Sequence, residues 1–395
     1  MCIRNSKINF QRLKSRRGVR MENIGFNNDV QVGGKIFHVQ TEYMEPTEKA
    51  VSSVFEDGRL IMKKNVDLSA SQPPLQIRNE VSTLHRQMMQ EVEMMFFISD
   101  KVRTIRHASS NYKLGLLFLS RNLFEEAIDE FRKAVAIDHD FAEAYLQLGK
   151  AYLKANLLQQ AKETFAEGLS KKDSYADLHF YLGYTYFLLN QPHEALKELK
   201  RALEINPSFI KAQFWLSYLY LKTIVDNLQD NVLPAKIERL NEAKERLSKI
   251  IEQDSPFKSK YIQLALDGIE ENDFEKVLSA LDKAAEDGDV STETEVENEF
   301  YLKFMFGGKG KDDQFIHEYT GKLKGLLTKY PDYPDLHNQL GIAYLIQCRN
   351  LFLNALEEFR HALTLNPDFT RAQKNLKLAE NDGKGFLILL RAILK

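Results

Sequence analysis

Histidines and one glycine-rich segment are the parts of this 395-residue sequence that could support catalysis or metal binding. None of the histidines forms a helix-spaced pair beside a carboxylate, which a zinc protease needs. The segment Gly307–Lys311 lacks the first glycine, the following Ser or Thr and the preceding strand of a phosphate-binding loop. Because no serine nucleophile elbow or cysteine–histidine pair is visible, the sequence predicts no enzyme, no metal and no cofactor. The nine histidines are His38, His85, His107, His139, His179, His193, His317, His337 and His361.

The net charge of −2 conceals an uneven distribution along the chain. Residues 1–20 carry seven Lys or Arg and no acidic side chain, so 47 basic and 56 acidic side chains remain in the rest. This acidic body argues against a nucleic-acid partner. Three interpretations of residues 1–20 stay open: a basic disordered tail or misassigned gene start, a transit-type peptide, and a basic contact arm.

Cysteine content and hydropathy narrow the class of protein further. The two cysteines, Cys2 and Cys348, are too few for a disulfide framework or a four-cysteine zinc site. No apolar run approaches the ~20 residues that would span a bilayer. With 44% hydrophobic residues the chain can build a sizeable core. We therefore expect a cytoplasmic protein without a membrane span.

Leu-Gly pairs recur at a spacing of 34 residues, and larger and smaller residues follow each pair at constant distances. A small residue suits the point where two helices cross closely, and large residues fill the space beside it. The first set is Leu114, Gly115, Phe118, Ala127, Phe131 and Ala134; the second is Leu148, Gly149, Tyr152, Ala161, Phe165 and Gly168; the third is Leu182, Gly183, Tyr186, Ala195, Leu199 and Ala202.

This pattern resembles the tetratricopeptide repeat (TPR) family, whose 34-residue units are helix–turn–helix hairpins. The resemblance implies a mostly α fold, a right-handed α-solenoid of about seven repeats over residues 108–382, in which each repeat buries its apolar face against its neighbours. The last unit matches at Leu340, Gly341, Tyr344, Ala355, Phe359 and Ala362, with its turn expected at Cys348–Leu353.

The fourth, fifth and sixth units match less regularly. In the fourth, the polar segment Asp226–Pro234 predicts a long loop between the two helices. The fifth fits at Ala265 and Val277, and the sixth fits at Phe306-Gly307, Tyr319 and Leu323. Residues Thr370–Glu380 predict a capping helix.

Residues 21–70 predict a small antiparallel β unit, with hairpin turns at Gly33-Gly34 and Asp57-Gly58. Residues 71–107 predict a linker and a long amphipathic helix from Leu75 to about Arg106, with an apolar stripe from Ile77 to Ile105. This helix either caps the first repeat and the β unit, dimerises, or occupies a groove. Residues 383–395 form an apolar tail that packs on the last helices or anchors to a membrane or partner, but is too short to span a bilayer.

The resemblance also implies a binding groove, since the first helix of each tetratricopeptide unit lines a concave surface that receives a peptide or helix. One lysine alone does not match the Lys and Asn set with which chaperone-binding members hold a terminal carboxylate. The expected groove is aromatic and aliphatic instead. Its residues are Tyr112, Leu116, Leu146, Lys150, Leu153, Lys154, Phe180, Tyr184, Phe187, Phe214 and Tyr218.

An aromatic groove suits the apolar face of a partner helix. The leading prediction is therefore a non-catalytic protein-binding adaptor or scaffold. Three alternatives stay open: a groove filled by the chain itself or by packing between repeats, a self-assembling homo-oligomer, and a β unit that binds or acts on a small ligand.

Overall fold

The computed structural model of the protein describes residues 24–69, 72–229, 231–252, 257, 259–287, 294–309 and 312–393. The predicted basic tail at residues 1–20 lies outside these ranges. The chain divides into two compact units, Met1–Asn298 and Glu299–Lys395.

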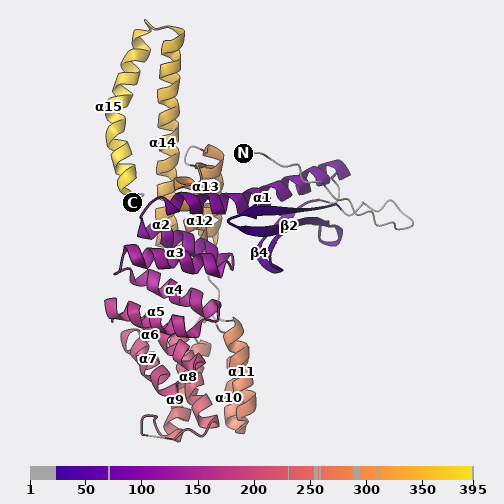
Figure 1. The fold of residues 1–395 in the computed structure, drawn as a ribbon, viewed down its shortest axis with the longest axis vertical. Coiled ribbons are helices and arrows are strands. Elements are labelled where there is room, and N and C mark those ends of the chain that lie inside the picture. Colours follow the sequence, from indigo (N-terminus) through magenta and orange to yellow (C-terminus); the bar gives the residue numbers. More distant parts are fainter. Residues whose placement is uncertain are drawn as a thin grey trace, which may run out of the picture. The chain divides into compact units, whose positions relative to one another are not determined.

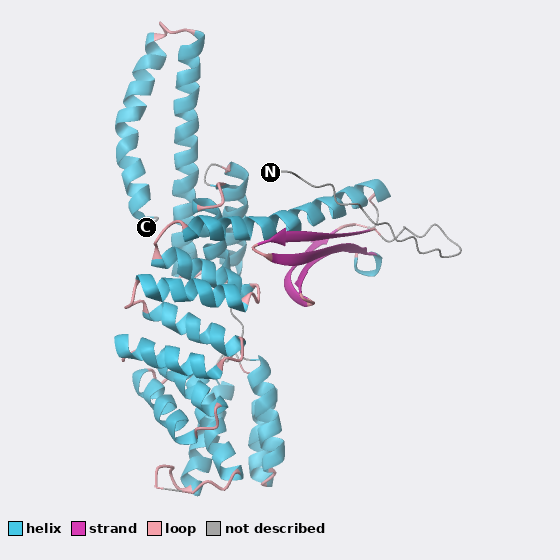
Figure 2. Ribbon diagram, in the orientation of Figure 1, coloured by secondary structure: helices cyan, strands magenta, loops and turns pink. Residues whose placement is uncertain are grey.

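A four-stranded antiparallel sheet, in the order β1-β2-β3-β4, begins the first unit (Figure 2). Both predicted hairpins are confirmed, because Gly33, Gly34 and Gly58 adopt the positive φ angles that two-residue turns require. The first strand starts at Gly25, and Phe26 and its neighbours pair with the second strand. The strands are β1 (Gly25–Val32), β2 (Lys35–Met44), β3 (Lys49–Glu56) and β4 (Arg59–Asp67).

Helix α1 (Pro74–Arg103) lies across one face of this sheet, in contact with β1, β2 and β3 (Figure 1). Alternate residues of the strands point toward it, so the two apolar surfaces close one core. The predicted stripe is buried from Ile77 to Val102, whereas Ile105 lies beyond the end of the helix and is exposed. The fully buried core residues include Phe37, Val39, Val54, Ile77, Val81 and Val92.

One histidine, His85, lies inside this core and completes a polar network between helix and sheet. Its Nε2 donates to Asn28 Oδ1 at 3.0 Å, and its Nδ1 lies 2.9 Å from Thr41 Oγ1 as the acceptor of that hydroxyl. Ser52 Oγ lies 2.6 Å from the same hydroxyl. Burial lowers the pKa of His85, which favours the neutral imidazole that this pattern needs. The histidine is therefore explained by packing.

The sheet and α1 dock on the first repeat. The Phe96 ring of α1 contacts both Phe37 in the sheet (5.4 Å between ring centroids) and Phe118 in the repeat (5.8 Å). Lys35 of β2 pairs with Glu56 at 2.7 Å and with Glu126 of the repeat at 2.6 Å. Of the roles predicted for this helix, the structure shows the cap on the first repeat and β unit.

Ten helices follow in the first unit as consecutive hairpins (Figure 1). Small residues lie where the sequence predicts close crossings: a Cβ built on Gly115 would stand 2.6 Å from the Phe131 ring, and one on Gly149 would stand 2.2 Å from Phe165. The helices are α2 (Ala108–Ser120), α3 (Phe124–Ile137), α4 (Ala142–Lys154), α5 (Leu158–Lys171), α6 (Ala176–Leu188), α7 (Pro192–Ile205), α8 (Ile210–Val225), α9 (Lys236–Glu252), α10 (Ser259–Glu271) and α11 (Phe274–Asp287).

An asparagine with positive φ follows the first helix of each of these five hairpins. Asparagine tolerates the left-handed conformation that ends a helix and satisfies its last carbonyls. After Asn122, for example, the Leu123 N–H donates to the Phe118 carbonyl at 3.0 Å. The sequence carries this signal, because the first three asparagines are also 34 residues apart. The set is Asn122, Asn156, Asn190, Asn227 and Asn272.

The less regular units are partly as predicted. The long connection of the fourth unit runs from Val225 to Lys236, as expected. In the sixth unit, α12 (Thr294–Met305) ends before Phe306-Gly307, so that pair does not lie inside the first helix as the pattern predicts. Tyr319 and Leu323 are buried in α13 (Asp313–Lys329), as the pattern requires.

The last unit departs most from prediction. No turn occurs at Cys348–Leu353: α14 is one 32-residue helix, Pro334–Leu365. Helix α15 (Thr370–Ile393) packs alongside it and continues past the predicted end of the cap at Glu380 (Figure 1). Among the described residues, no helix has both the length and the apolar composition needed to cross a membrane.

Candidate functional site

The predicted groove residues lie on α2, α4, α6 and α8, but they differ in accessibility. Leu146, Phe180, Phe214 and Tyr218 are buried in the packing between helices. Tyr112, Leu116, Lys150, Leu153, Tyr184 and Phe187 are half-buried, and Lys154 is exposed. The predicted set therefore contains a buried floor and a partly accessible layer above it.

The structure brings the residues of the third and fourth units together around a residue that the prediction missed, Trp215. Its ring lies 4.5 Å from Tyr184, 5.1 Å from Phe187 and 5.5 Å from Tyr218, between ring centroids. Trp215 is half-buried and is the only tryptophan in the sequence. The signal that could have found it is its register, since it follows Tyr181 by one 34-residue period.

Residues from the fifth unit cover part of the floor. The rings of Phe214 and Phe257 stack at 4.1 Å between centroids, with 15° between their planes. Tyr218 Oη donates to Asp282 Oδ1 of α11. The aromatic surface at the fourth unit is thus closed on that side by the chain's own residues, and its accessible portion is the layer of Tyr184, Phe187 and Trp215.

Charged side chains lie beside the aromatic residues of the predicted groove. Lys150 Nζ lies 5.3 Å from the centroid of the Tyr181 ring, a cation–π distance. Burial raises the pKa of the Asp177 carboxyl, while Lys150 and Lys211 act in the opposite direction. Burial, with a smaller contribution from Glu143, raises the pKa of Tyr112 to about 12. Tyr112 therefore stays neutral at physiological pH and offers its ring and hydroxyl group for binding.

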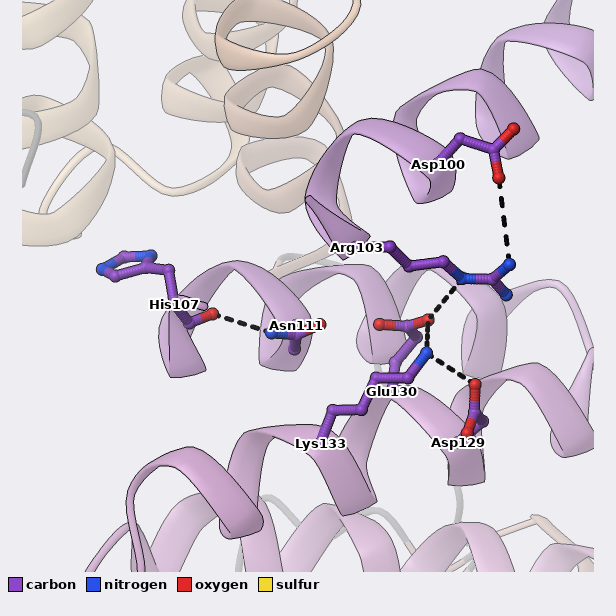
Figure 3. A network of polar contacts seen from close by, with 7 residues as sticks. All are labelled: Asp100, Arg103, His107, Asn111, Asp129, Glu130 and Lys133. Carbon is purple, nitrogen blue, oxygen red and sulfur yellow. Dashed lines mark hydrogen bonds and ion pairs between the residues drawn. The ribbon is translucent and has the colours of Figure 1, made fainter. Parts of the chain in front are cut away.

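A separate group of charged residues lies where α1 meets the first repeat (Figure 3). Glu130 is almost completely buried, and it accepts a hydrogen bond from Lys133 at 2.8 Å. Arg103 of α1 lies 3.8 Å from the same carboxylate and 3.8 Å from Asp100. Burial raises the pKa of Glu130. These contacts connect the end of α1 to α3.

In the described part of the chain, no group of three or more His, Cys, Asp or Glu side chains is placed to hold a metal ion. The chemistry that the accessible aromatic layer offers is non-covalent contact: large rings with polar edges, beside lysine and carboxylate side chains.

Two segments of the chain match models of known protein families. Residues 109–156 match the family model described as TPR repeat, and residues 176–209 match the one described as Tetratricopeptide repeat. No curated protein matches the sequence.

Three of the solved structures to which this chain is similar have sequence identities of 25% or less. The crystal structure of YrrB, a TPR protein with an unusual peptide-binding site, is 25% identical and covers 48% of this chain and 91% of its own, with a TM-score of 0.35. PilF of Pseudomonas aeruginosa is 19% identical and covers 59% and 96%, with a TM-score of 0.35. The second TPR domain of human RPAP3, in complex with an HSP70 peptide, is 23% identical and covers 28% and 93%, with a TM-score of 0.28.

Proposed function

We propose that this chain, which contains tetratricopeptide repeats, is a non-catalytic adaptor that holds a helical segment of a partner protein against α4, α6 and α8. The observation that carries the proposal is the half-buried aromatic layer of Tyr184, Phe187 and Trp215 above a buried floor. Tetratricopeptide repeats are protein-interaction modules, which supports binding in general. Tyrosine and tryptophan are the side chains that most often dominate the free energy of such contacts.

The geometry favours an amphipathic helix as the ligand. Apolar anchors at positions i, i+3 or i+4, and i+7 would rest on the aromatic layer, and polar residues on either side would meet Lys150 and Asp177. A ligand that ends in a carboxylate is less suitable, because the accessible layer consists of aromatic rings and Lys150 alone does not match the Lys and Asn set that holds a terminal carboxylate. A helix therefore uses more of the accessible surface than a peptide terminus does.

The test begins with a displayed library of amphipathic peptides selected against the full chain. Selected peptides are then titrated while the fluorescence of Trp215 is recorded, since this residue is the only tryptophan. The variant Tyr184→Ala should weaken binding by roughly 2 kcal/mol, about 30-fold, because it removes a central ring. Phe180 and Phe214 are unsuitable for this purpose, because truncating a buried phenylalanine costs about 3–5 kcal/mol of stability.

The matched control is Tyr186→Ala. Tyr186 is on the same helix, also half-buried, but it lies near Glu194 and Glu198 of α7, away from the proposed surface. If the selected peptides bind the Tyr184→Ala and Tyr186→Ala variants equally well, the proposed surface is wrong. Circular dichroism of both variants verifies that the repeats stay folded.

A further inference from the structure

Helix α14 carries both halves of a repeat in one unbroken helix. The segment Arg349–Phe352 has the same sequence, Arg-Asn-Leu-Phe, as Arg121–Phe124, where the first repeat turns. At that turn Asn122 has a φ of 56° and α2 ends at Ser120. In α14 the same four residues are helical. One local sequence therefore adopts two backbone conformations in this protein.

Several packing residues of this opened repeat are exposed, although others, such as Ala343 and Leu356, are buried. Tyr344 is 45% exposed and Leu351 is 68% exposed, whereas Phe118 and Leu123, their counterparts in the first repeat, are 1% and 0% exposed. A Cβ built on Gly341 meets no described atom within 4 Å, although the same Leu-Gly motif at Gly115 faces a phenylalanine ring. The residue types at these positions are those of a close crossing between two helices, but in the described part of the chain no second helix buries them.

The missing contact cannot form within a straight helix. Gly341 and Phe359, which correspond to the contacting residues Gly115 and Phe131, are separated by 18 residues, or about 27 Å along the axis. Asn350 lies midway between them. Consider two antiparallel α14 helices related by a two-fold axis that passes between them at the level of Asn350. In that arrangement each Gly341 lies against Phe359 of the other helix. The contact is self-complementary, as a two-fold interface requires.

We propose that a second copy of this chain covers this surface, so that two α14 helices exchange halves and complete two repeats across a two-fold axis. Each copy leaves packing positions exposed in both halves of α14, Tyr344 in the first and Leu351 in the second, and the same sequence in a second copy supplies residues that complement both. Large exposed apolar side chains on a helix favour such a contact. The segment Arg349–Phe352 acts as the hinge, since exchange of identical elements takes place through a connection that opens.

Cross-linking between two kinds of chain tests the proposal. In a background of Cys2→Ser and Cys348→Ser, one chain carries Gly341→Cys and the other carries Phe359→Cys, and the two are co-expressed with different tags. A short bismaleimide should join the two different chains, and light scattering should give twice the 45.7 kDa of one chain. The control replaces Phe359→Cys with Glu357→Cys, an exposed site about 200° away around the helix, and should give roughly tenfold less product.

Two results would overturn the proposal. If a single chain with Gly341→Cys and Phe359→Cys cross-links within itself and has the mass of a monomer, α14 closes as an ordinary hairpin. If neither link forms and the protein is monomeric at high concentration, α14 stays straight and unpaired. Circular dichroism of the cysteine variants confirms that either result comes from folded protein.

Discussion

The first and last repeats contain the same tetrapeptide but fold differently around it. In the first repeat, Asn122 ends α2 and the neighbouring Leu123 is completely buried. In the last repeat, Asn350 lies inside α14 and the neighbouring Leu351 is exposed. Local sequence is the same in both places, so the surroundings decide which conformation forms.

The surroundings differ in identifiable contacts. The first repeat is covered on one side by α1, where Phe96 contacts Phe118. The Phe131 ring occupies the space beside its glycine, Gly115. In the last repeat the Asn350 side chain donates to Asp313 Oδ1 at 2.8 Å, and Arg349 Nη2 donates to Asn350 Oδ1 at 2.6 Å. These bonds hold the asparagine in a helix. The difference shows that intrinsic helix propensity is a weak determinant where neighbours supply packing or hydrogen bonds.

The largest difference in stability between the two repeats should come from truncating their equivalent phenylalanines. Phe131→Ala removes a fully buried ring and should lower the free energy of unfolding by about 3–5 kcal/mol. Phe359→Ala removes a partly exposed ring and should cost about 1 kcal/mol in dilute solution. Urea unfolding followed by Trp215 fluorescence reports the first unit, and circular dichroism reports the helices of both. Equal losses for the two variants would mean that the last repeat is packed as tightly as the first.

Glycine should be tolerated at the first of the two asparagines and should destabilise the protein at the second. Asn122→Gly keeps a residue that accepts a positive φ, so stability should change by less than about 0.5 kcal/mol. Asn350→Gly places glycine inside a helix and removes the bond to Asp313, so the second unit should lose about 1–2 kcal/mol. Thermal unfolding followed by circular dichroism measures both changes. A destabilised Asn122 variant beside an unaffected Asn350 variant would contradict the assigned backbone conformations.

The regular repeats could be predicted from sequence because each landmark residue has one local task. Gly115 and Gly149 allow close crossings, and Gly33 allows a turn, so residue type and spacing are sufficient. The straight course of α14 could not be predicted this way, because its last repeat has the landmarks of a hairpin. It depends on contacts with α13 that spacing does not reveal.

The candidate binding surface was predicted in part for a similar reason. Periodicity places Phe180, Tyr184 and Phe214 on first helices of their repeats, but it does not show which of them the neighbouring helices cover. Phe214 is buried under Phe257, which lies 43 residues away in sequence and outside any repeat landmark. Trp215 was missed because adjacent positions on a helix differ by only 100° in direction, and the buried neighbour matched the family pattern better.

The comparison of the two repeats extends to a pair of glutamates, Glu130 and Glu358, which occupy equivalent positions eight residues after their asparagines. Glu358 is exposed, whereas Glu130 is buried between Arg103 and Lys133 (Figure 3). Within the described residues, Glu130 Oε2 has no hydrogen-bond partner. The two sites therefore allow the same substitution in a buried and an exposed setting.

The smallest of the expected effects is a pH dependence of stability that arises from the burial of Glu130. Because burial raises its pKa above the ordinary value of 4.5, the folded state binds this proton more readily than the unfolded state. The stability that the protonated carboxyl contributes is fully present below about pH 4.5 and is lost as the pH rises through the raised pKa. Glu130→Gln should therefore raise the unfolding midpoint at pH 7, and the gain should disappear toward pH 4. Glu358→Gln should leave the midpoint unchanged at both pH values, since its side chain is exposed. Urea titrations at several pH values measure the difference, and a Glu130→Gln variant that is less stable at pH 7 would show that the pairs with Lys133 and Arg103 outweigh the burial of the charge.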